Sequence, residues 1–142
     1  MKDSDQCFTP PQIFETLRLK FDIDVAAPSG GVVWIPAKRF FTEEDDGLAQ
    51  KWIGRVWMNP PFSQATPWVQ KFIEHRNGIA LLHMAKSAWF TELWESGAKI
   101  ALAGTRLYFQ KHGAKHQIFT ACVLCAFGKA CENAIARLGV VR

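Results

Sequence analysis

The tetrapeptide Asn59–Phe62, with the sequence Asn-Pro-Pro-Phe, constrains the fold more than any other part of this chain. It follows a short β-prone run, Val56–Met58, and precedes an amphipathic segment, Thr66–His75, that is typical of a helix. Proline has no N–H group and biases the residue before it toward an extended backbone, so the tetrapeptide cannot coil into a helix. The pattern predicts a loop at the carboxyl end of a buried strand, where open α/β sheets bind their ligands.

This tetrapeptide also predicts a pocket for a planar group that bears an NH2. The backbone carbonyls of Asn59 and Pro60 and the Asn59 side-chain amide can accept hydrogen bonds, and the Phe62 ring supplies a flat apolar wall. An ordinary Pro-Pro turn is the alternative interpretation, and the position between a strand and a helix favours the pocket. The residues predicted to form the reaction site are Asn59, Pro60, Pro61 and Phe62.

Strand-like and helix-like patterns alternate along the rest of the chain. Helices are expected at Pro10–Leu19, where Thr9 can cap the first turn, and at Gly47–Trp52, Thr66–His75, Ala88–Glu95 and Ala130–Leu138. Strands are expected at Asp22–Ala27, Val32–Ile35, Arg39–Thr42, Arg55–Met58, Gly78–His83 and Lys99–Ala103. A final hairpin is expected from Arg106–Gln110 and Gln117–Phe127 around a basic loop.

This order predicts a single α/β domain over residues 1–142, with a mostly parallel sheet and an antiparallel C-terminal hairpin. The formal net charge of +4 and the pI of about 9.0 are compatible with a polyanionic partner and do not by themselves identify one. The first residues are polar, and the longest apolar run, Phe119–Phe127, is too short to span a bilayer. We therefore expect no membrane partner.

The four cysteines do not form a pattern typical of secreted proteins. Cys122 and Cys125 have the spacing of a zinc motif, but they lie in a β-prone run, where a separation of three directs two side chains to opposite faces. No second pair of cysteines or closely spaced histidines accompanies them. The sequence predicts buried thiols and no metal site.

Four motifs in a fixed order extend the interpretation: Phe8–Pro10, Phe21–Ala27, Asp46–Leu48 followed by Trp52, and Asn59–Phe62. With them the chain resembles the amino-methyltransferases that use S-adenosylmethionine and carry an Asn/Asp/Ser-Pro-Pro-aromatic motif. Within that group it is similar to the small phage and prophage DNA adenine-N6-methyltransferases, the Dam-like family. The resemblance runs from about Thr9 to Phe127 and implies a Rossmann-like methyltransferase fold.

The resemblance implies a site for S-adenosylmethionine at the carboxyl ends of the first strands. The Asp24 carboxylate would accept hydrogen bonds from the cofactor's amino group, and Asp46, with Asp45 as a rival, would contact its adenine. Small residues, Ala26 and Ala27, stand where many relatives have a glycine-rich loop. The residues assigned to the cofactor are Phe8, Thr9, Pro10, Asp22, Asp24, Ala26, Asp46 and Asn59.

The implied reaction is methyl transfer to the exocyclic N6 amine of adenine in DNA. Acceptors at Asn59 and Pro60 would draw the amine nitrogen toward tetrahedral geometry, and Phe62 would stack on the base after it leaves the helix. This slot is more often Tyr in the family, so the chain keeps the ring and loses the hydroxyl. The residues expected to contact DNA are Lys86, Ser87, Lys111, His112, Lys115 and His116.

Three alternatives use the same residues: methylation of cytosine N4, methylation of glutamine N5 in protein, and a catalytically inactive DNA-binding relative. Cytosine enzymes more often carry Ser at position 59, and an inactive relative would have no reason to retain both prolines. A domain of this size leaves DNA sequence recognition to its loops, to a second copy or to a helper subunit. The resemblance to phage enzymes implies the cytoplasm of a bacterial host cell.

Overall fold

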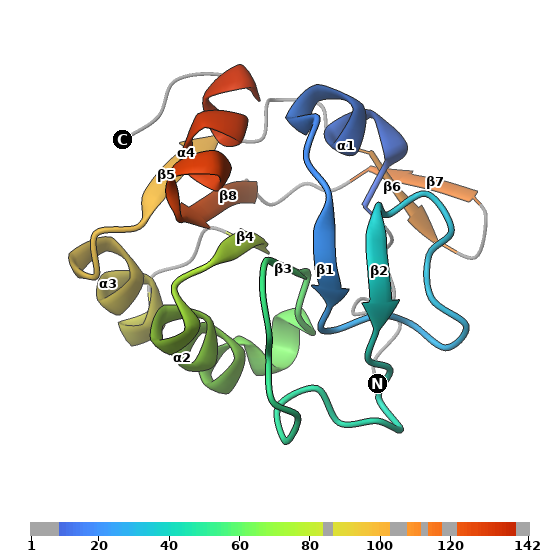
Figure 1. The fold of residues 1–142 in the computed structure, drawn as a ribbon, viewed down its shortest axis with the longest axis horizontal. Helices are drawn as coiled ribbons and strands as arrows, with labels where there is room; N and C mark the ends of the chain where they lie inside the picture. Colours follow the sequence, from blue (N-terminus) through green and yellow to red (C-terminus); the bar gives the residue numbers. More distant parts are fainter. Residues whose placement is uncertain (1–8, 84–86, 103–107, 112–113, 118–121, 139–142) are drawn as a thin grey trace.

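A computed structural model describes residues 9–83, 87–102, 108–111, 114–117 and 122–138, with 108–111 and 114–117 described as backbone only. Its main sheet has six strands in the order β2-β1-β3-β4-β8-β5 (Figure 1). The strands are β1 Phe21–Asp24, β2 Ala37–Phe40, β3 Val56–Met58, β4 Gly78–His83, β5 Lys99–Leu102 and β8 Cys122–Phe127. The first four run parallel, and β8 runs antiparallel to both β4 and β5.

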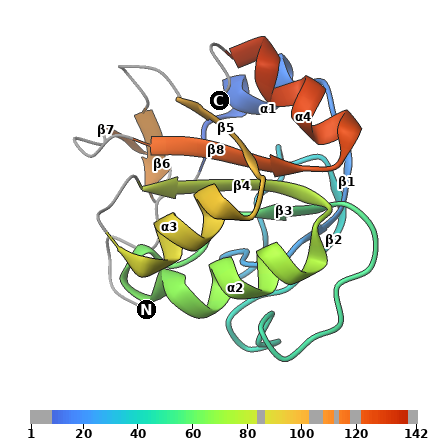
Figure 2. The same cartoon turned by 90° about the vertical axis from the view of Figure 1, so that its left-hand side faces the viewer.

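Helices cover both faces of this sheet, so the described chain forms three layers (Figure 2). One face carries α1 and α4, and the other carries α2 and α3. The helical segments are α1 Pro11–Leu17, η2 Phe62–Gln64, α2 Ala65–His75, α3 Ala88–Glu95, α4 Lys129–Ile135 and η3 Ala136–Leu138. The predicted α/β fold class, with its mostly parallel sheet and antiparallel hairpin, is confirmed.

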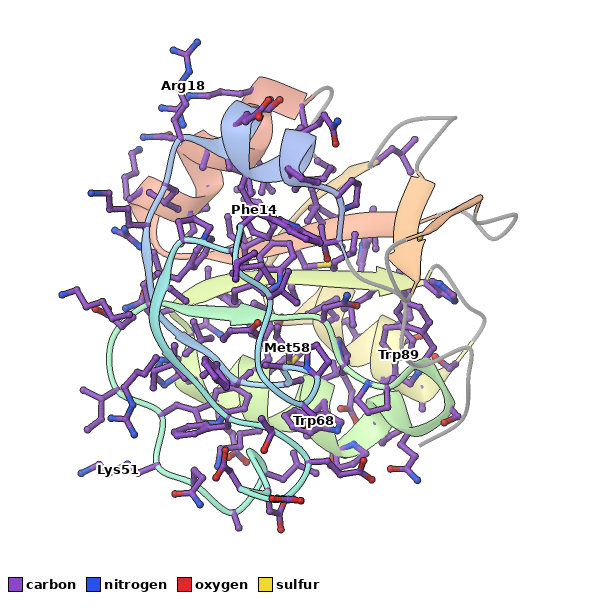
Figure 3. All side chains as sticks on the ribbon, turned by 90° about the vertical axis from the view of Figure 1, so that its right-hand side faces the viewer. Phe14, Arg18, Lys51, Met58, Trp68 and Trp89 are labelled. Atoms are coloured by element: carbon purple, nitrogen blue, oxygen red, sulfur yellow. The ribbon has the colours of Figure 1, made fainter. Side chains whose placement is uncertain are left out.

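Side-chain alternation along the buried strands builds a separate core on each face. Trp57 packs with Phe14 of α1, whereas its neighbour Met58 belongs to the core under Trp68 of α2 and Trp89 of α3. Figure 3 shows Phe14 on one side of the sheet and the other labelled aromatic side chains on the opposite side. Both residues preceding Asn59 are fully buried, so β3 is a rigid base for the loop that follows it.

The cysteine prediction agrees with this alternation. Cys122 belongs to the core beside α1 and α4, and Cys125 belongs to the core beside α2 and α3. Burial raises the pKa of the Cys122 thiol to about 12 and raises that of Cys125 as well. Among the described residues, no group of three His, Cys, Asp or Glu side chains could hold a metal ion.

The pairing predicted for the C-terminal hairpin is wrong in one respect. Its first strand, β6 Tyr108–Lys111, pairs with a short strand, β7 Ala114–Gln117, in a separate two-stranded sheet. The later strand β8 inserts between β4 and β5 of the main sheet. All six residues of β8 are buried, so it is a central strand and could not serve as one arm of an exposed hairpin.

Two smaller predictions also fail. Val32–Ile35 forms no strand, because the Ile35 N–H bonds to the Val32 carbonyl and closes a turn, and β2 begins only at Ala37. Thr9 does not cap the first helix with its side chain, since Pro10 occupies the N-cap position and the Thr9 hydroxyl has a different partner, described below.

The helix predicted at Gly47–Trp52 is a series of turns. Side chains bond to the backbone carbonyls of this segment: Trp52 Nε1 donates to Gly47, and Lys71 Nζ donates to Leu48 and Gln50. A Cβ at Gly47 would lie 2.1 Å from the Val25 carbonyl oxygen, so the turn approaches β1 more closely than any other residue type allows.

Candidate active site at the carboxyl edge of the sheet

A cavity of about 470 Å³ opens where the chain leaves β1, β2 and β3. Because parallel strands end at the same edge, loops that are distant in sequence meet there. Ala26 comes from the loop after β1, Glu43 from the loop after β2, and Pro61 from the tetrapeptide after β3. The cavity is lined by Ala26, Ala27, Thr42, Glu43, Asp46, Gly47, Leu48, Pro61, Ser63, Gln64 and Trp68.

Asp24, the last residue of β1, carries a buried carboxylate; it stands two residues before Ala26 of the cavity wall and is not itself a lining residue. The residue is only 3 % exposed, and its Oδ1 atom has no hydrogen-bond partner among the described residues. Burial raises the pKa of Asp24 from 3.8 to about 7, although a hydrogen bond from the Ala26 N–H opposes that rise. A buried acceptor without a partner is costly, which makes this oxygen a candidate contact for a bound group.

Asp22 lies on the same strand and has a different environment. Its Oδ2 accepts the Arg55 N–H at 2.7 Å, at the amino end of β3, and Lys38 Nζ lies 3.6 Å from its Oδ1. The Arg55 N–H lowers the pKa of Asp22. A Cβ at Gly54 would lie 2.2 Å from Asp22 Oδ2, so the chain leaves room for this carboxylate. Asp22 does not line the cavity, and its contacts tie β1 to the start of β3.

The structure separates the two rival acids of the acidic run. Asp45 Oδ2 accepts the backbone N–H and the hydroxyl of Thr42, at 2.9 and 3.1 Å, so this carboxylate closes a turn. Asp46 has a left-handed backbone, with φ of 56°, and it lines the cavity. Asp46 is therefore the one of the two that stands at the cavity wall.

Helix α2 holds the loop that carries Asp46. Trp52 Nε1 donates to the Gly47 carbonyl at 2.8 Å, and the Trp52 ring stacks on Trp68 with centroids 6.4 Å apart. Lys71 Nζ lies 5.1 Å from the centre of the Trp52 ring and 2.7 Å from the Leu48 carbonyl oxygen. Trp68 itself lines the cavity, so one helix face both forms part of the wall and fixes the loop opposite.

The tetrapeptide contacts the amino-terminal motif as well as the cavity. Asn59 Nδ2 donates to Thr9 Oγ1 at 3.1 Å, and Thr9 is fully buried with its carbonyl bonded to Trp34 Nε1 at 2.7 Å. Pro60 and Pro61 are both buried, and the Pro61 carbonyl accepts the Gln64 N–H. Pro10, the N-cap residue of α1, adjoins the same contact. The structure thus brings together two motifs 50 residues apart.

Phe62 begins the short η2 helix and stacks on the imidazole of His83, the last residue of β4. The ring centroids are 3.5 Å apart and the planes are inclined by 27°. His83 Nε2 is buried and has no hydrogen-bond partner among the described residues, and burial lowers the pKa of His83. The sequence pattern predicts this histidine only as the last residue of a strand.

Ser87, at the N-cap position of α3, is one of the predicted DNA contacts, and it makes no capping hydrogen bond with its side chain. Its Oγ is buried and has no partner within the described part of the chain. Phe8, Lys86 and His112 lie outside the described residues. Lys111, Lys115 and His116 lie on β6 and β7, where only the backbone is described.

Several cavity residues were missed by the sequence interpretation, chiefly Glu43, Gln64 and Trp68. Glu43 could have been found, because it follows β2 as Asp24 ends β1 and the two strands are parallel neighbours. Gln64 and Trp68 give no such signal, since helical positions become cavity walls only through the packing of α2 against the 46–52 loop.

Comparison with known proteins shows which family this chain belongs to. The family model for DNA N-6-adenine-methyltransferase (Dam) matches residues 1–136. The chain belongs to the Dam family. A DNA N-6-adenine-methyltransferase of Escherichia phage T1 is 37% identical over 89 residues, which are 57% of this chain and 36% of that protein. Another, from Haemophilus phage HP1, is 32% identical over 99 residues, 62% of this chain and 56% of that protein.

The matched segments thus span between about a third and just over half of the lengths of these two phage relatives. A solved structure of precorrin-6y C5,15-methyltransferase from Geobacter metallireducens GS-15 superimposes with a TM-score of 0.47 and 12% identity, over 83% of this chain and 86% of that one. No described helix of this Dam-family chain is long and apolar enough to span a bilayer.

Proposed function

We propose that this Dam-family chain transfers a methyl group from S-adenosylmethionine to the N6 amine of adenine in DNA. The observation that carries the proposal is the position of the tetrapeptide. Pro61 forms a wall of the 470 Å³ cavity while Asn59, two residues earlier, bonds to Thr9. One short loop therefore contributes Pro61 to the wall of a cofactor-sized cavity and carries the polar Asn59 side chain two residues away. Methyl transfer between two bound molecules requires such closeness of two binding positions.

The cavity residues, together with the nearby Asp24, fit the chemical groups of S-adenosylmethionine. Asp24 is not itself a lining residue, but it has a buried oxygen with no partner among the described residues, and this oxygen suits a positively charged amino group, which would lower the pKa of the carboxyl and keep it ionised. Asp46 and Glu43 place further acceptors on the wall, and Trp68 and Leu48 give apolar surface for an adenine ring. The bound cofactor would supply an electrophilic methyl group on a sulfonium.

Asn59 would orient the target amine. Its Nδ2 is held by Thr9 Oγ1, which fixes the amide plane and makes Oδ1 the end that can accept an N–H of the base. The Pro60 carbonyl would accept the second N–H. With both N–H bonds directed, the nitrogen lone pair points out of the ring plane and toward the methyl donor, whose carbon–sulfur bond would break as the carbon–nitrogen bond forms and one N6 proton leaves to solvent. No nucleophilic side chain is required, so positioning carries most of the rate.

Phe62 would stack on the base once it has left the duplex, and stacking on an aromatic side chain stabilises a base by about 1–3 kcal/mol. DNA would be held by the strands β6 and β7 with Lys111, Lys115 and their neighbours, and by Ser87 near the end of β4. A second copy of the chain or a helper subunit would be one source of sequence recognition. The host-cell cytoplasm is the expected place of action.

The test is incubation of the purified chain with isotopically labelled S-adenosylmethionine and, separately, DNA, RNA and protein. Label in DNA that digests to N6-methyladenosine is the expected result. Label in N4-methylcytosine or in glutamine would establish one of the alternative methyltransferases. DNA and cofactor binding without any transfer would identify an inactive relative and contradict the proposal.

A further inference from the structure

The stacked pair of Phe62 and His83 holds a planar heterocycle where the proposed function requires one. Phe62 comes from η2 directly behind β3, and His83 ends the neighbouring strand β4. Their centroids are 3.5 Å apart with an interplanar angle of 27°, which is the near-parallel arrangement of a nucleobase on an aromatic side chain. We propose that the imidazole of His83 occupies the position of the flipped target base and leaves it when the base enters.

Within the residues that the structure describes, the imidazole is held in this position by its ring contact with Phe62. Its Nε2 is buried without a partner among the described residues, so this nitrogen has lost its bonds to water and gained none in return. Leaving the stack therefore costs no Nε2 hydrogen bond and lets that atom meet solvent or the base edge. A side chain built only to support Phe62 would be better served by an apolar ring, which carries no such nitrogen.

Only the side chain has to move. The backbone of His83 is fixed by its pairing with Cys122 of β8, and the preceding residues of β4 are fully buried between β3 and β8. The side chain itself is half-buried, at the open end of the strand. Rotation about the Cα–Cβ bond can thus vacate the position without disturbing the sheet or the tetrapeptide.

This inference rests on the proposed function, because it takes Phe62 to be the surface on which the base stacks. It adds the identity of the group that competes with the base. The ligand class is a planar nitrogen heterocycle of nucleobase type, and the size of residue 83 sets how easily that ring enters. A small residue should open the position, and a permanent apolar ring should keep it closed.

Two substitutions separate these cases. His83→Ala empties the position, and His83→Phe fills it with a ring that gains nothing from leaving. The adenine methylated by the wild-type chain is first mapped and then replaced by 2-aminopurine, whose fluorescence reports base flipping and capture. Since an aromatic pair contributes a modest stabilisation, we expect His83→Ala to capture the base about two- to tenfold more tightly and His83→Phe to capture it more weakly by a similar factor. Phe62→Ala, which removes the stacking surface, is the matched control.

Capture that His83→Ala weakens as much as Phe62→Ala does would overturn the proposal, because the imidazole would then be a fixed support. Equal capture by the wild-type chain, His83→Ala and His83→Phe would overturn it too. A second readout uses NMR of labelled histidine: ring-current shifts of His83 should be present in the free chain, absent in Phe62→Leu and lost on adding target DNA. Failure of the proposed function is seen separately, as a wild-type chain that methylates no adenine.

Discussion

The two aspartates of β1 lie two positions apart and are held in opposite ways. Asp22 accepts the Arg55 N–H, faces Lys38 and has a lowered pKa. Asp24 is buried, has a raised pKa, and one of its oxygens has no partner in the described part of the chain. The first carboxylate has its partners already and stabilises the sheet at the amino edge. The second is paired only in part, at the carboxyl edge beside the cavity. A structural carboxylate and a candidate binding carboxylate thus differ in whether their oxygens already have hydrogen-bond partners among the described residues.

The largest effect is expected at Asn59, which, like Asp24 and unlike Asp22, belongs to the proposed site. Asn59→Ala removes the side-chain acceptor while the backbone carbonyls stay in place, so single-turnover methylation should fall by about a hundredfold or more. Cofactor affinity should change little, because the cavity is formed by other residues. Asn59→Ala with near-normal turnover, in a variant of unchanged circular dichroism, would refute the proposed role.

The aspartates themselves give the most direct test. Asp24→Ala should weaken S-adenosylmethionine binding by about ten- to a hundredfold, as the loss of a charge-assisted hydrogen bond predicts. Asp22→Ala is the matched control: it should lower thermal stability and leave cofactor affinity within about twofold, since the Asp22 carboxylate is already held by the Arg55 N–H and faces Lys38. Calorimetry that finds the same loss of affinity in both variants would remove the distinction between them.

The pH dependence of stability should differ in sign between the two. Burial raises the pKa of Asp24 to about 7, so the folded chain keeps a proton that the unfolded chain loses above pH 3.8. The stability contributed by Asp24 is therefore complete below that value and is lost as the pH rises to 7, with a slope of at most about 1.4 kcal/mol per pH unit. The lowered pKa of Asp22 has the opposite effect: its contribution is present above pH 3.8 and is lost on acidification.

Urea unfolding of the cofactor-free chain at several pH values measures this difference. Asp24→Asn should remove most of the decline toward pH 7 and should be more stable than the wild-type chain at neutral pH. Asp22→Asn should instead reduce the loss of stability at acid pH. A decline toward neutral pH that persists unchanged in Asp24→Asn would mean that another group causes it.

The smallest effect concerns the hairpin of β6 and β7, which belongs to a separate sheet from the two aspartates of β1. Neutralising Lys111 and Lys115 together should reduce the salt dependence of DNA binding by about one to two phosphate contacts, with little dependence on DNA sequence. Fluorescence anisotropy over a range of salt concentrations measures the slope. An unchanged slope in a folded variant would place the DNA elsewhere on the molecule.

Sequence patterns predicted well those features of the fold that depend on residues close together in the chain. The bounds of β4 and α3 were predicted correctly, and the loop of Asn59–Phe62 lies at the end of a buried strand as its prolines required. The insertion of β8 between β4 and β5 depends on pairing between distant segments, which periodicity does not encode. The stack of Phe62 on His83 was missed for the same reason, since the two residues meet only when neighbouring strands end together.

The tether between α2 and the 46–52 loop has a consequence for how this chain tolerates change. Lys71 bonds to the loop through main-chain oxygens of Leu48 and Gln50, atoms that every amino acid provides. The side chain at position 48 can therefore be exchanged without loss of the Lys71 hydrogen bond, whereas Gln50 also holds the loop by donating from Nε2 to the Asp45 carbonyl. Lys71 and Gly47 are constrained instead: Lys71 by its reach and charge, and Gly47 because any Cβ at this position would lie 2.1 Å from the Val25 carbonyl oxygen. For the position of this loop, Lys71 should thus be less replaceable than Leu48, although Leu48 lines the cavity and Lys71 does not.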